Sequence, residues 1–427
     1  MKKIILIIIS LIFFIPKVFA ATLSEALNQA YNNNPELNAE RENIKVSEED
    51  LNISKGEYHP TLTLSGSKSK EDTNKLTSQS GGDAAVTDVD PQTTSITIEQ
   101  TLFDAGRSAE HEKNKIGIEL AIAKLLKKEQ DILYKAVEAY TGLILANEKF
   151  EINKVNVNLL ERQVETDSVR LERGQVTLSD VAQSESSLAE AQAKFIQAEN
   201  EVLTSKLNYE NIIGPLTSSN LLDKDSILNF IMPVDLNSAI ELSKKNNPDL
   251  IIAKLEYKQS EKDTIIAKSD LSPTAKLSFE RSYSEDLSST YDEREKDILK
   301  ATISWPFYSG GKNRATYKKN KNLQNRKRLL LDNITKTNKT NVASAWSNFQ
   351  SSKSLLNSVE LQVRAAEIAN EGITAEYESG VGRSTLEVIQ SNSFLLNAQI
   401  SLANSERNYL LSQFNLLKSI GLLNSDY

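Results

Sequence analysis

The side chains that most often carry catalysis or hold metals are scarce in this chain. It contains no cysteine and only two histidines, His59 and His111, which cannot assemble a metal site. No nucleophile stands beside a base in a recognisable catalytic motif. The sequence therefore predicts a protein that is not an enzyme and that uses no cofactor or metal.

Two short polar motifs remain as candidates for chemistry. Residues 177–180 read Thr-Leu-Ser-Asp, and residues 384–387 read Ser-Thr-Leu-Glu. A serine or threonine followed three residues later by an acidic residue is a capping box, which satisfies free N–H groups at the start of a helix. The same carboxylates would attract cations if several copies met around a narrow pore. Both roles stay open, and they do not exclude each other.

The overall composition favours long helices over a large compact core. Among 427 residues there are only 15 glycines and 9 prolines, and aromatic residues make up 6%. Ala, Leu, Glu, Lys, Gln, Asn and Ser dominate, as is typical of long helices. The net formal charge of -8 gives no reason to expect nucleic-acid binding.

The first twenty residues predict an export signal. Lys2 and Lys3 precede an apolar run from Ile4 to Ile15, and Val18-Phe19-Ala20 offers a cleavage point. A membrane anchor is the alternative, but this run is shorter than the ~20 residues that a spanning helix needs. We therefore expect a signal peptide over residues 1–20 and a mature chain that is either soluble or inserted into the membrane as β-structure.

The mature sequence contains an internal duplication. Asn34-Pro35 and Pro60 recur as Asn247-Pro248 and Pro273, each 213 residues later. A fixed offset of this kind indicates two structural repeats. The predicted boundaries are 21–214 for the first repeat, 215–234 for a linker, 235–421 for the second repeat and 422–427 for the C-terminal end.

Each repeat ends in a heptad series. Apolar residues recur every seven positions in both halves and then stop at Ile-Gly. The two series are Val181, Leu188, Phe195, Val202 and Tyr209, and Val388, Leu395, Leu402, Tyr409 and Leu416. Apolar heptads predict coiled coils, and glycine is a common C-terminal stop of a helix.

Each repeat reads as helix, β-hairpin, very long helix, turn and helix. Asn followed by Pro predicts the start of the first helix. After Pro60 and Pro273, and again over 96–102 and 299–305, apolar and polar residues alternate, which predicts strands with one apolar face. Residues 69–91 and the acidic stretch 284–297 are predicted as the loops that join the paired strands.

These elements require more than one copy of the chain. A helix from about Gly106 to Glu172 would be on the order of 100 Å long at ~1.5 Å per residue, so it must pack against other helices. Four strands cannot close a barrel, and an open edge is not tolerated in lipid. We expect several subunits to share one barrel. The alternative is a soluble β-cap whose apolar face packs on the helices.

The order of these elements resembles the TolC family of outer-membrane channels over essentially the whole mature chain. The motifs that carry the resemblance are LSEAL and NNPEL near the start, the proline-led strand starts at Pro60 and Pro273, TLFDAGR at 101–107, RGQVTLSDV at 173–181, RSTLEV at 383–388 and NYLLSQFNLLKSIG at 408–421. The fold class expected is mainly α with membrane β, built from two internal repeats. It combines a long coiled-coil helical barrel with an oligomeric transmembrane β-barrel to which each subunit contributes four strands.

The resemblance implies a homotrimer in the outer-membrane lipid, with its helical barrel in the periplasm. It implies a periplasmic adaptor and an inner-membrane ABC or proton-driven transporter as partners, and export of proteins or small toxic molecules. No nucleic acid is expected. The alternative function is a trimeric coiled-coil adhesin with a small barrel anchor, although adhesins end in their anchor and both hairpins here lie inside the halves.

The resemblance also implies a set of gate residues at the two helix turns. The residues matched to pore closure are Asp180, Ser179, Gln163, Arg383 and Tyr377. Glu387, four residues after Arg383, matches a ring of acidic residues that selects cations. Where a second acidic ring is expected the chain has Gln390, so a single ring is predicted.

Overall fold

The computed structural model describes residues 22–72, 89–216, 232–288, 291–380 and 382–424. The predicted signal peptide, most of the linker and the last three residues lie outside this range. The chain divides into two compact units, and each draws on both repeats. Unit 1 comprises Met1–Asn38, Lys128–Asn247 and Thr340–Tyr427, and unit 2 comprises Ala39–Lys127 and Pro248–Lys339.

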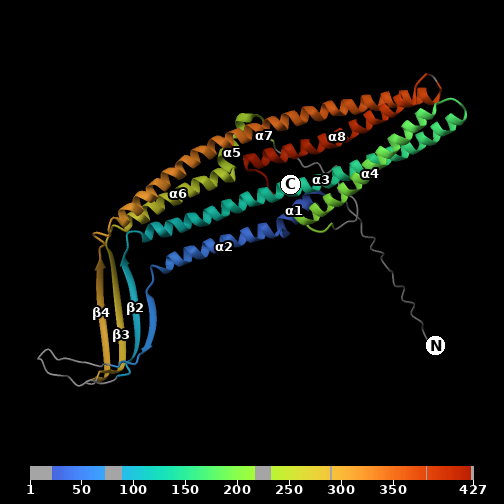
Figure 1. Ribbon diagram of the computed structural model, residues 1–427. Helices are drawn as coiled ribbons and strands as arrows, with labels where there is room; N and C mark the ends of the chain where they lie inside the picture. Colours follow the sequence, from blue (N-terminus) through green and yellow to red (C-terminus); the bar gives the residue numbers. More distant parts are fainter. Residues whose placement is uncertain (1–21, 73–88, 217–231, 289–290, 381, 425–427) are drawn as a thin grey trace, which may run out of the picture. The chain divides into compact units, whose positions relative to one another are not determined.

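Unit 2 contains one antiparallel sheet with the strand order β1-β2-β3-β4 (Figure 1). Its strands are β1 (Thr61–Lys68), β2 (Gln92–Phe103), β3 (Thr274–Ser288) and β4 (Tyr291–Ser304). The two predicted hairpins are therefore present, and β2 pairs with β3 to join them into one sheet.

One predicted loop is wrong. Residues 284–297, expected to join the second pair of strands, are mostly strand, because β3 continues to Ser288 and β4 begins at Tyr291. Charged residues pair across these strands, with Arg281 Nη2 3.6 Å from Glu295 and Arg281 Nε 3.8 Å from Asp297. Cross-strand pairs of opposite charge stabilise a sheet, so the high polarity that suggested a loop is compatible with a strand pair.

The sheet has the predicted apolar face. Ladder pairing places Leu62 beside Ile98, Ile98 beside Phe279 and Phe279 beside Leu299, so one apolar row crosses all four strands. The two outer members are largely exposed, Leu62 at 71% and Leu299 at 73%. The described helices of this chain therefore do not cover the face, which argues against the soluble β-cap.

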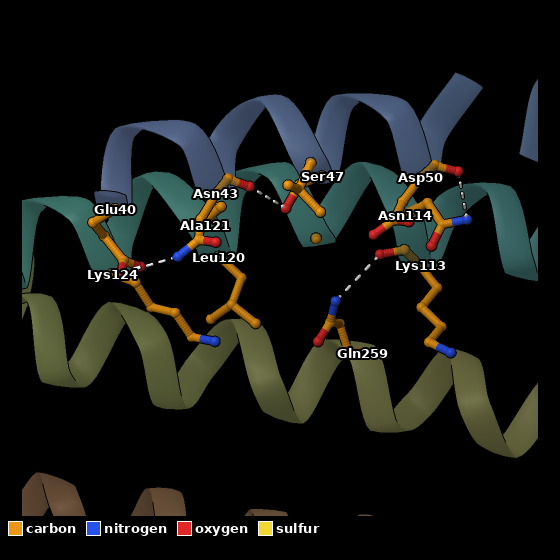
Figure 2. A pocket seen from close by; sticks show the side chains of 12 residues that line it. Glu40, Asn43, Ser47, Asp50, Lys113, Asn114, Leu120, Ala121, Lys124 and Gln259 are labelled. Atoms are coloured by element: carbon orange, nitrogen blue, oxygen red, sulfur yellow. Dashed lines mark hydrogen bonds between the residues drawn. The ribbon is translucent and has the colours of Figure 1, made fainter. Parts of the chain in front are cut away.

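Four helices in unit 2 lie in a row that follows the strand order. They are α2 (Pro35–Gly56), α3 (Arg107–Glu172), α6 (Pro248–Ser269) and α7 (Lys312–Glu378). Asn114 Nδ2 of α3 donates to the Asp50 carbonyl of α2, and Gln259 of α6 donates to the Lys113 carbonyl of α3 (Figure 2). The row ends with α7, whose Lys327 pairs with a glutamate of α6.

Unit 1 is built from helix pairs. It contains α1 (Leu23–Asn33), α4 (Leu178–Ile212), α5 (Leu236–Asn246) and α8 (Thr385–Ile420), together with the C-terminal parts of α3 and α7. The rings of Phe150 and Phe195 lie 5.1 Å apart between α3 and α4. The rings of Phe349 and Tyr409 stack 5.9 Å apart between α7 and α8. Its largest core cluster includes fully buried Phe414 and Leu416.

The predicted heptads lie in α4 and α8 as expected. Val181, Tyr209, Val388 and Leu416 are buried members of the two series, and Gly421 ends α8 with a φ of 78°, the left-handed cap that glycine allows. Three residues further along, a second buried series in α4 consists of small side chains, namely Ser184, Ala191 and Ala198. Within the described part of the chain, no helix is both long enough and apolar enough to cross a membrane.

Candidate functional site

The candidate site lies in unit 1, at the two turns where α3 passes into α4 and α7 passes into α8. Both predicted capping boxes form. The Asp180 carboxylate accepts a 2.8 Å bond from the Thr177 N–H, and the Glu387 carboxylate accepts a 2.8 Å bond from the Ser384 N–H. Gly174 precedes the first box with a φ of 71°, a conformation that glycine adopts readily.

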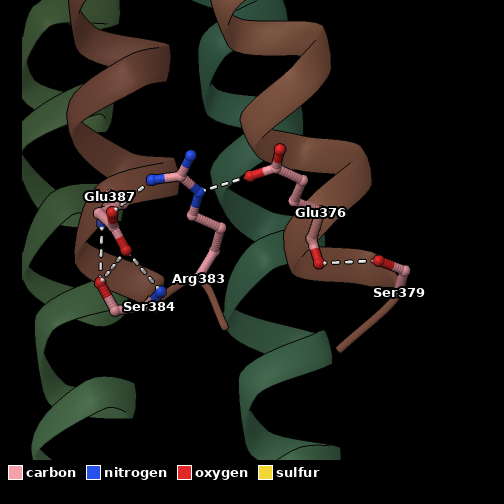
Figure 3. A network of polar contacts seen from close by, with 5 residues as sticks. All are labelled: Glu376, Ser379, Arg383, Ser384 and Glu387. Carbon is pink, nitrogen blue, oxygen red and sulfur yellow. Dashed lines mark hydrogen bonds and ion pairs between the residues drawn. The ribbon is translucent and has the colours of Figure 1, made fainter. Parts of the chain in front are cut away.

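Arg383 lies between two carboxylates (Figure 3). Its Nε is 2.6 Å from Glu376 of α7, and its Nη1 is 2.9 Å from Glu387 of α8. The arginine therefore connects the end of one helix to the start of the next across the turn. Sequence reasoning identified Arg383 and Glu387 but missed Glu376.

These hydrogen bonds lower the pKa of both box carboxylates. The Ser384 N–H, and next the Arg383 side chain, hold the pKa of Glu387 below its usual value of 4.5. The Thr177 N–H and then its hydroxyl lower the pKa of Asp180 in the same way. Both groups therefore stay ionised at neutral pH, as a cation-attracting role requires.

Asp180 and Arg383 have different partners within a single chain. Asp180 bonds to Thr177 in its own capping box, and Arg383 bonds to its two glutamates. Ser179 is exposed on the first turn of α4 and makes no side-chain hydrogen bond within the described residues. Gln390, one turn beyond Glu387, is exposed.

The other two predicted residues meet at a carboxylate that sequence reasoning missed. Asp167 of α3 is completely buried. It accepts two 3.0 Å bonds from Gln163 Nε2, a 2.5 Å bond from the Tyr377 hydroxyl and a bond from the Ser184 hydroxyl. The Tyr377 hydroxyl is also 3.1 Å from Thr385 Oγ1 of α8. This buried Asp167 network thus joins α3, α4, α7 and α8.

An arginine of α3 reinforces the same junction. The Arg170 guanidinium lies 4.2 Å from the centre of the Tyr377 ring, and its Nη2 donates a 3.1 Å bond to the Tyr377 carbonyl. Burial, followed by the bond to Asp167, raises the pKa of the Tyr377 hydroxyl. The phenol therefore stays protonated and remains a hydrogen-bond donor.

A sequence signal for Asp167 exists in α3. A series of buried positions recurs every seven residues along this helix: Ile132, Ala139, Ala146, Asn153, Leu160 and Asp167. A charged residue at a buried heptad position that is otherwise uncharged is costly unless it is bonded, and it can fix the partner or the register of the helix. The acid at the end of this series could have been singled out on that ground.

The site suits mechanical closure better than catalysis. Its polar groups are bonded to one another across helix pairs, and no group of three or more metal-binding side chains occurs among the described residues. The buried Asp167 carboxylate bonds to one side chain each of α3, α4 and α7 and thereby connects these helices.

Comparison with known proteins agrees with this architecture. The profile of the outer membrane efflux protein family matches residues 26–215 and 239–422. The outer membrane efflux protein BepC of Brucella suis is 25% identical, over 95% of this chain and 86% of its own length. The outer membrane protein TolC of Escherichia coli K12 is 24% identical, over 99% of this chain and 87% of its own.

Solved structures share the fold. The Campylobacter jejuni CmeC outer membrane channel superposes with a TM-score of 0.83 at 14% identity, covering 95% of this chain and 87% of that one. CusC superposes with a TM-score of 0.81, covering 95% and 93%. With two matched segments that span most of its length, the chain belongs to the outer membrane efflux protein family and is a non-enzymatic outer-membrane channel protein.

Proposed function

We propose that three copies of this chain form an exit channel whose helices extend into the periplasm. In this proposal a periplasmic adaptor and an inner-membrane ABC or proton-driven transporter deliver the cargo. Relatives named for alkaline protease secretion and for efflux support proteins or small toxic molecules as cargo. The repeats 21–214 and 235–421, joined by the linker 215–234, supply one hairpin each.

The observation that carries the trimer is the open, one-sided sheet. Its apolar row is exposed at both ends, at Leu62 and Leu299, and β1 and β4 each leave one edge unpaired within the described sheet. An exposed apolar row suits contact with lipid, whereas unpaired strand edges are not tolerated there unless the sheet closes. Joining β4 of one copy to β1 of the next in three copies would give a twelve-stranded barrel, an even number as in bacterial barrels.

The turns of unit 1 would form the periplasmic entrance and its gate. Within one chain, the bond from Tyr377 to Asp167, supported by Gln163, holds the two helix pairs together. Between copies, we propose that Arg383 reaches Asp180 and Ser179 of the neighbouring turn, because all three are at the surface of one chain. Glu387 would form the ring that selects cations.

Purified protein in planar lipid bilayers tests the channel. We expect a detergent-solubilised particle with the protein mass of three chains, and discrete cation-preferring conductance steps after insertion. A water-soluble monomer that never inserts would contradict the proposal. A particle of another size that still conducts would contradict the trimer alone.

A further inference from the structure

The strand β4 separates its charges by sign between the two faces of the sheet. Residues 293–297 read Glu-Arg-Glu-Lys-Asp, so acidic and basic residues alternate along the strand. Successive side chains of a strand point to opposite faces. The acidic residues of this stretch therefore lie on one face of the sheet and the basic residues on the other.

The basic residues lie on the polar face. Asp297 is two residues from Leu299, a member of the apolar row, so the acidic residues of β4 share the apolar face. Arg294, Lys296 and Lys300 are an odd number of residues from Leu299 and lie on the opposite face. Their ladder partners on β3 are all serines, namely Ser284, Ser282 and Ser278.

The polar face has a net positive charge. Over the regular part of the ladder, its charged residues are Glu99 on β2, Lys276 and Glu280 on β3, and Arg294, Lys296 and Lys300 on β4. Lys276 and Glu99 form an ion pair at 2.8 Å, which leaves three basic residues and one acidic residue. The three basic residues are exposed, and their side chains make no ion pair or hydrogen bond within the described residues.

The polar face is also the inner face of the curved sheet. On the central strand β2, Thr93 of the polar face is half-buried, whereas its neighbour Thr94 of the apolar face is exposed. The same difference separates Thr97 from Ile98. Side chains converge on the concave side of a sheet and shield one another, so this pattern indicates that the polar face is concave. When such a sheet closes, its concave face becomes the interior of the barrel.

We propose that Arg294, Lys296 and Lys300 make the strand-lined part of the pore attractive to anions. This inference rests on the proposed three-copy barrel, in which β4 pairs with β1 of the next copy. The polar face of β1 contains only threonine and serine, at Thr61, Thr63, Ser65 and Ser67. The neighbouring strand therefore leaves the positive charge uncompensated. Fixed charges of one sign along a pore concentrate solutes of the opposite sign.

The solutes that fit this lining are those rich in carboxylates. Lysine and arginine side chains bind carboxylates through charge-assisted hydrogen bonds. A lipid surface does not fit, because the three basic residues lie on the face opposite the apolar row. The sign is also opposite to that of the proposed Glu387 ring. A solute in transit would thus meet one region that favours cations and another that favours anions.

Charge-selective labelling tests the placement and the sign, because the natural chain has no cysteine. Ser282 pairs with Lys296 in the ladder. In Ser282→Cys trimers, an anionic methanethiosulfonate should react at least about fivefold faster than a cationic one, after each rate is normalised to that with 2-mercaptoethanol. Adding Arg294→Gln and Lys296→Gln should remove the preference. Ile98→Cys, on the apolar face, is the matched control and should react slowly with both reagents.

Block of single channels by an acidic peptide tests the consequence for transport. Lys296→Gln should raise the concentration of hexaglutamate that halves the current by at least about threefold. Arg281→Gln is the matched control, because Arg281 pairs with Asp297 in the adjacent row and lies on the apolar face. It removes the same charge and should leave the block unchanged. Equal weakening in both variants would show that net charge alone matters and would overturn the proposal.

The labelling experiment separates this inference from the channel proposal. Conducting trimers in which Ser282→Cys shows no preference for the anionic reagent would overturn the positive lining alone. A reactive Ile98→Cys beside an unreactive Ser282→Cys would show that the polar face does not line the pore. A protein that forms no conducting oligomer would overturn the channel proposal and this inference together.

Discussion

The hydroxyl of Tyr377 donates a 2.5 Å hydrogen bond to the Asp167 carboxylate, joining α7 to α3 across 210 residues of sequence. Asp167 has no exposed surface, and the three side chains bonded to it are neutral donors. A buried charge held only by such donors depends on each of them. The closure of the two helix pairs should therefore be sensitive to single changes in this network.

Removing the Tyr377 hydroxyl should favour the open channel. Tyr377→Phe keeps the buried ring and its contact with Arg170 but leaves Asp167 one donor short. The loss of a partner at a buried polar group costs about 1–3 kcal/mol, and each 1.4 kcal/mol is about tenfold in the closed-to-open ratio. Single-channel recording in planar bilayers should show larger conductance or longer open times.

Ser168→Ala serves as the control for this change, because Ser168 is next to Asp167 in α3 but is exposed, and its hydroxyl donates to the Val164 carbonyl of its own helix. Its effect should be small beside that of Tyr377→Phe. Unchanged conductance in Tyr377→Phe trimers that are correctly assembled would show that the Asp167 network stabilises the fold without controlling the pore.

Much of the fold could be predicted because its signals are local. The Asn-Pro start of α2, the capping boxes and the heptads of α4 and α8 each depend on residues close in sequence. The Asn34 side chain, for example, accepts the N–H groups of Glu36 and Leu37 at 3.0 and 3.2 Å. Residues 284–297 were misassigned to a loop because their charges pair across strands, which a single strand's composition does not reveal.

Only the part of the candidate site that depends on neighbouring residues in the sequence could be predicted. A capping box can be recognised from four consecutive residues, and Asp180 and Glu387 do form such boxes in the structure. Asp167 and Glu376 acquire their roles from side chains that lie on other helices or beyond a turn. Their partners are Tyr377 and Arg383, respectively. No local pattern specifies such a contact, although the buried heptad position of Asp167 is a usable signal.

The capping role of Ser384 can be measured separately from any role in the pore. Ser384→Ala removes the side-chain acceptor at the start of α8, which costs about 1 kcal/mol. Amide exchange at residues 385–388 should become about fivefold faster. Glu387→Gln, which can keep the reciprocal bond of the box, should exchange nearly like the wild type. Equal exchange in both variants would mean that packing, not the cap, fixes this turn.

The proposed link between copies predicts coupling between Arg383 and Asp180. If the two residues meet across the subunit boundary, Arg383→Ser and Asp180→Ala should each raise single-channel conductance, and the double variant should rise no further than the larger single effect. Such non-additivity is expected of directly interacting residues. Additive effects would contradict the contact between copies. Arg383 would then pair only with Glu376 and Glu387 of its own chain, and Asp180 would act only as a helix cap.

Cation preference should persist in acid. The Ser384 N–H and Arg383 lower the pKa of Glu387, so the carboxylate stays charged as the pH falls through the usual glutamate range. Cation selectivity is lost only at a pH below that range. Arg383→Ala removes the contribution of Arg383, so the pKa of Glu387 rises towards its usual value and the loss of cation selectivity moves to higher pH. Reversal potentials recorded across a pH series measure the midpoint, and a midpoint that does not move would contradict this account.

Substitution of Glu387 tests the proposed ring of three carboxylates. Three carboxylates around one axis repel one another, and cations in the pore offset that repulsion. Glu387→Gln should therefore lower the cation preference strongly and weaken block by multivalent cations, while folding barely changes. Because Gln390 lies one turn further along and is exposed, Gln390→Glu should add a second ring and partly restore selectivity in the Glu387→Gln channel. Reversal potentials that stay constant in Glu387→Gln would refute the ring and leave Glu387 as the cap of α8, since the capping box alone then accounts for its contacts.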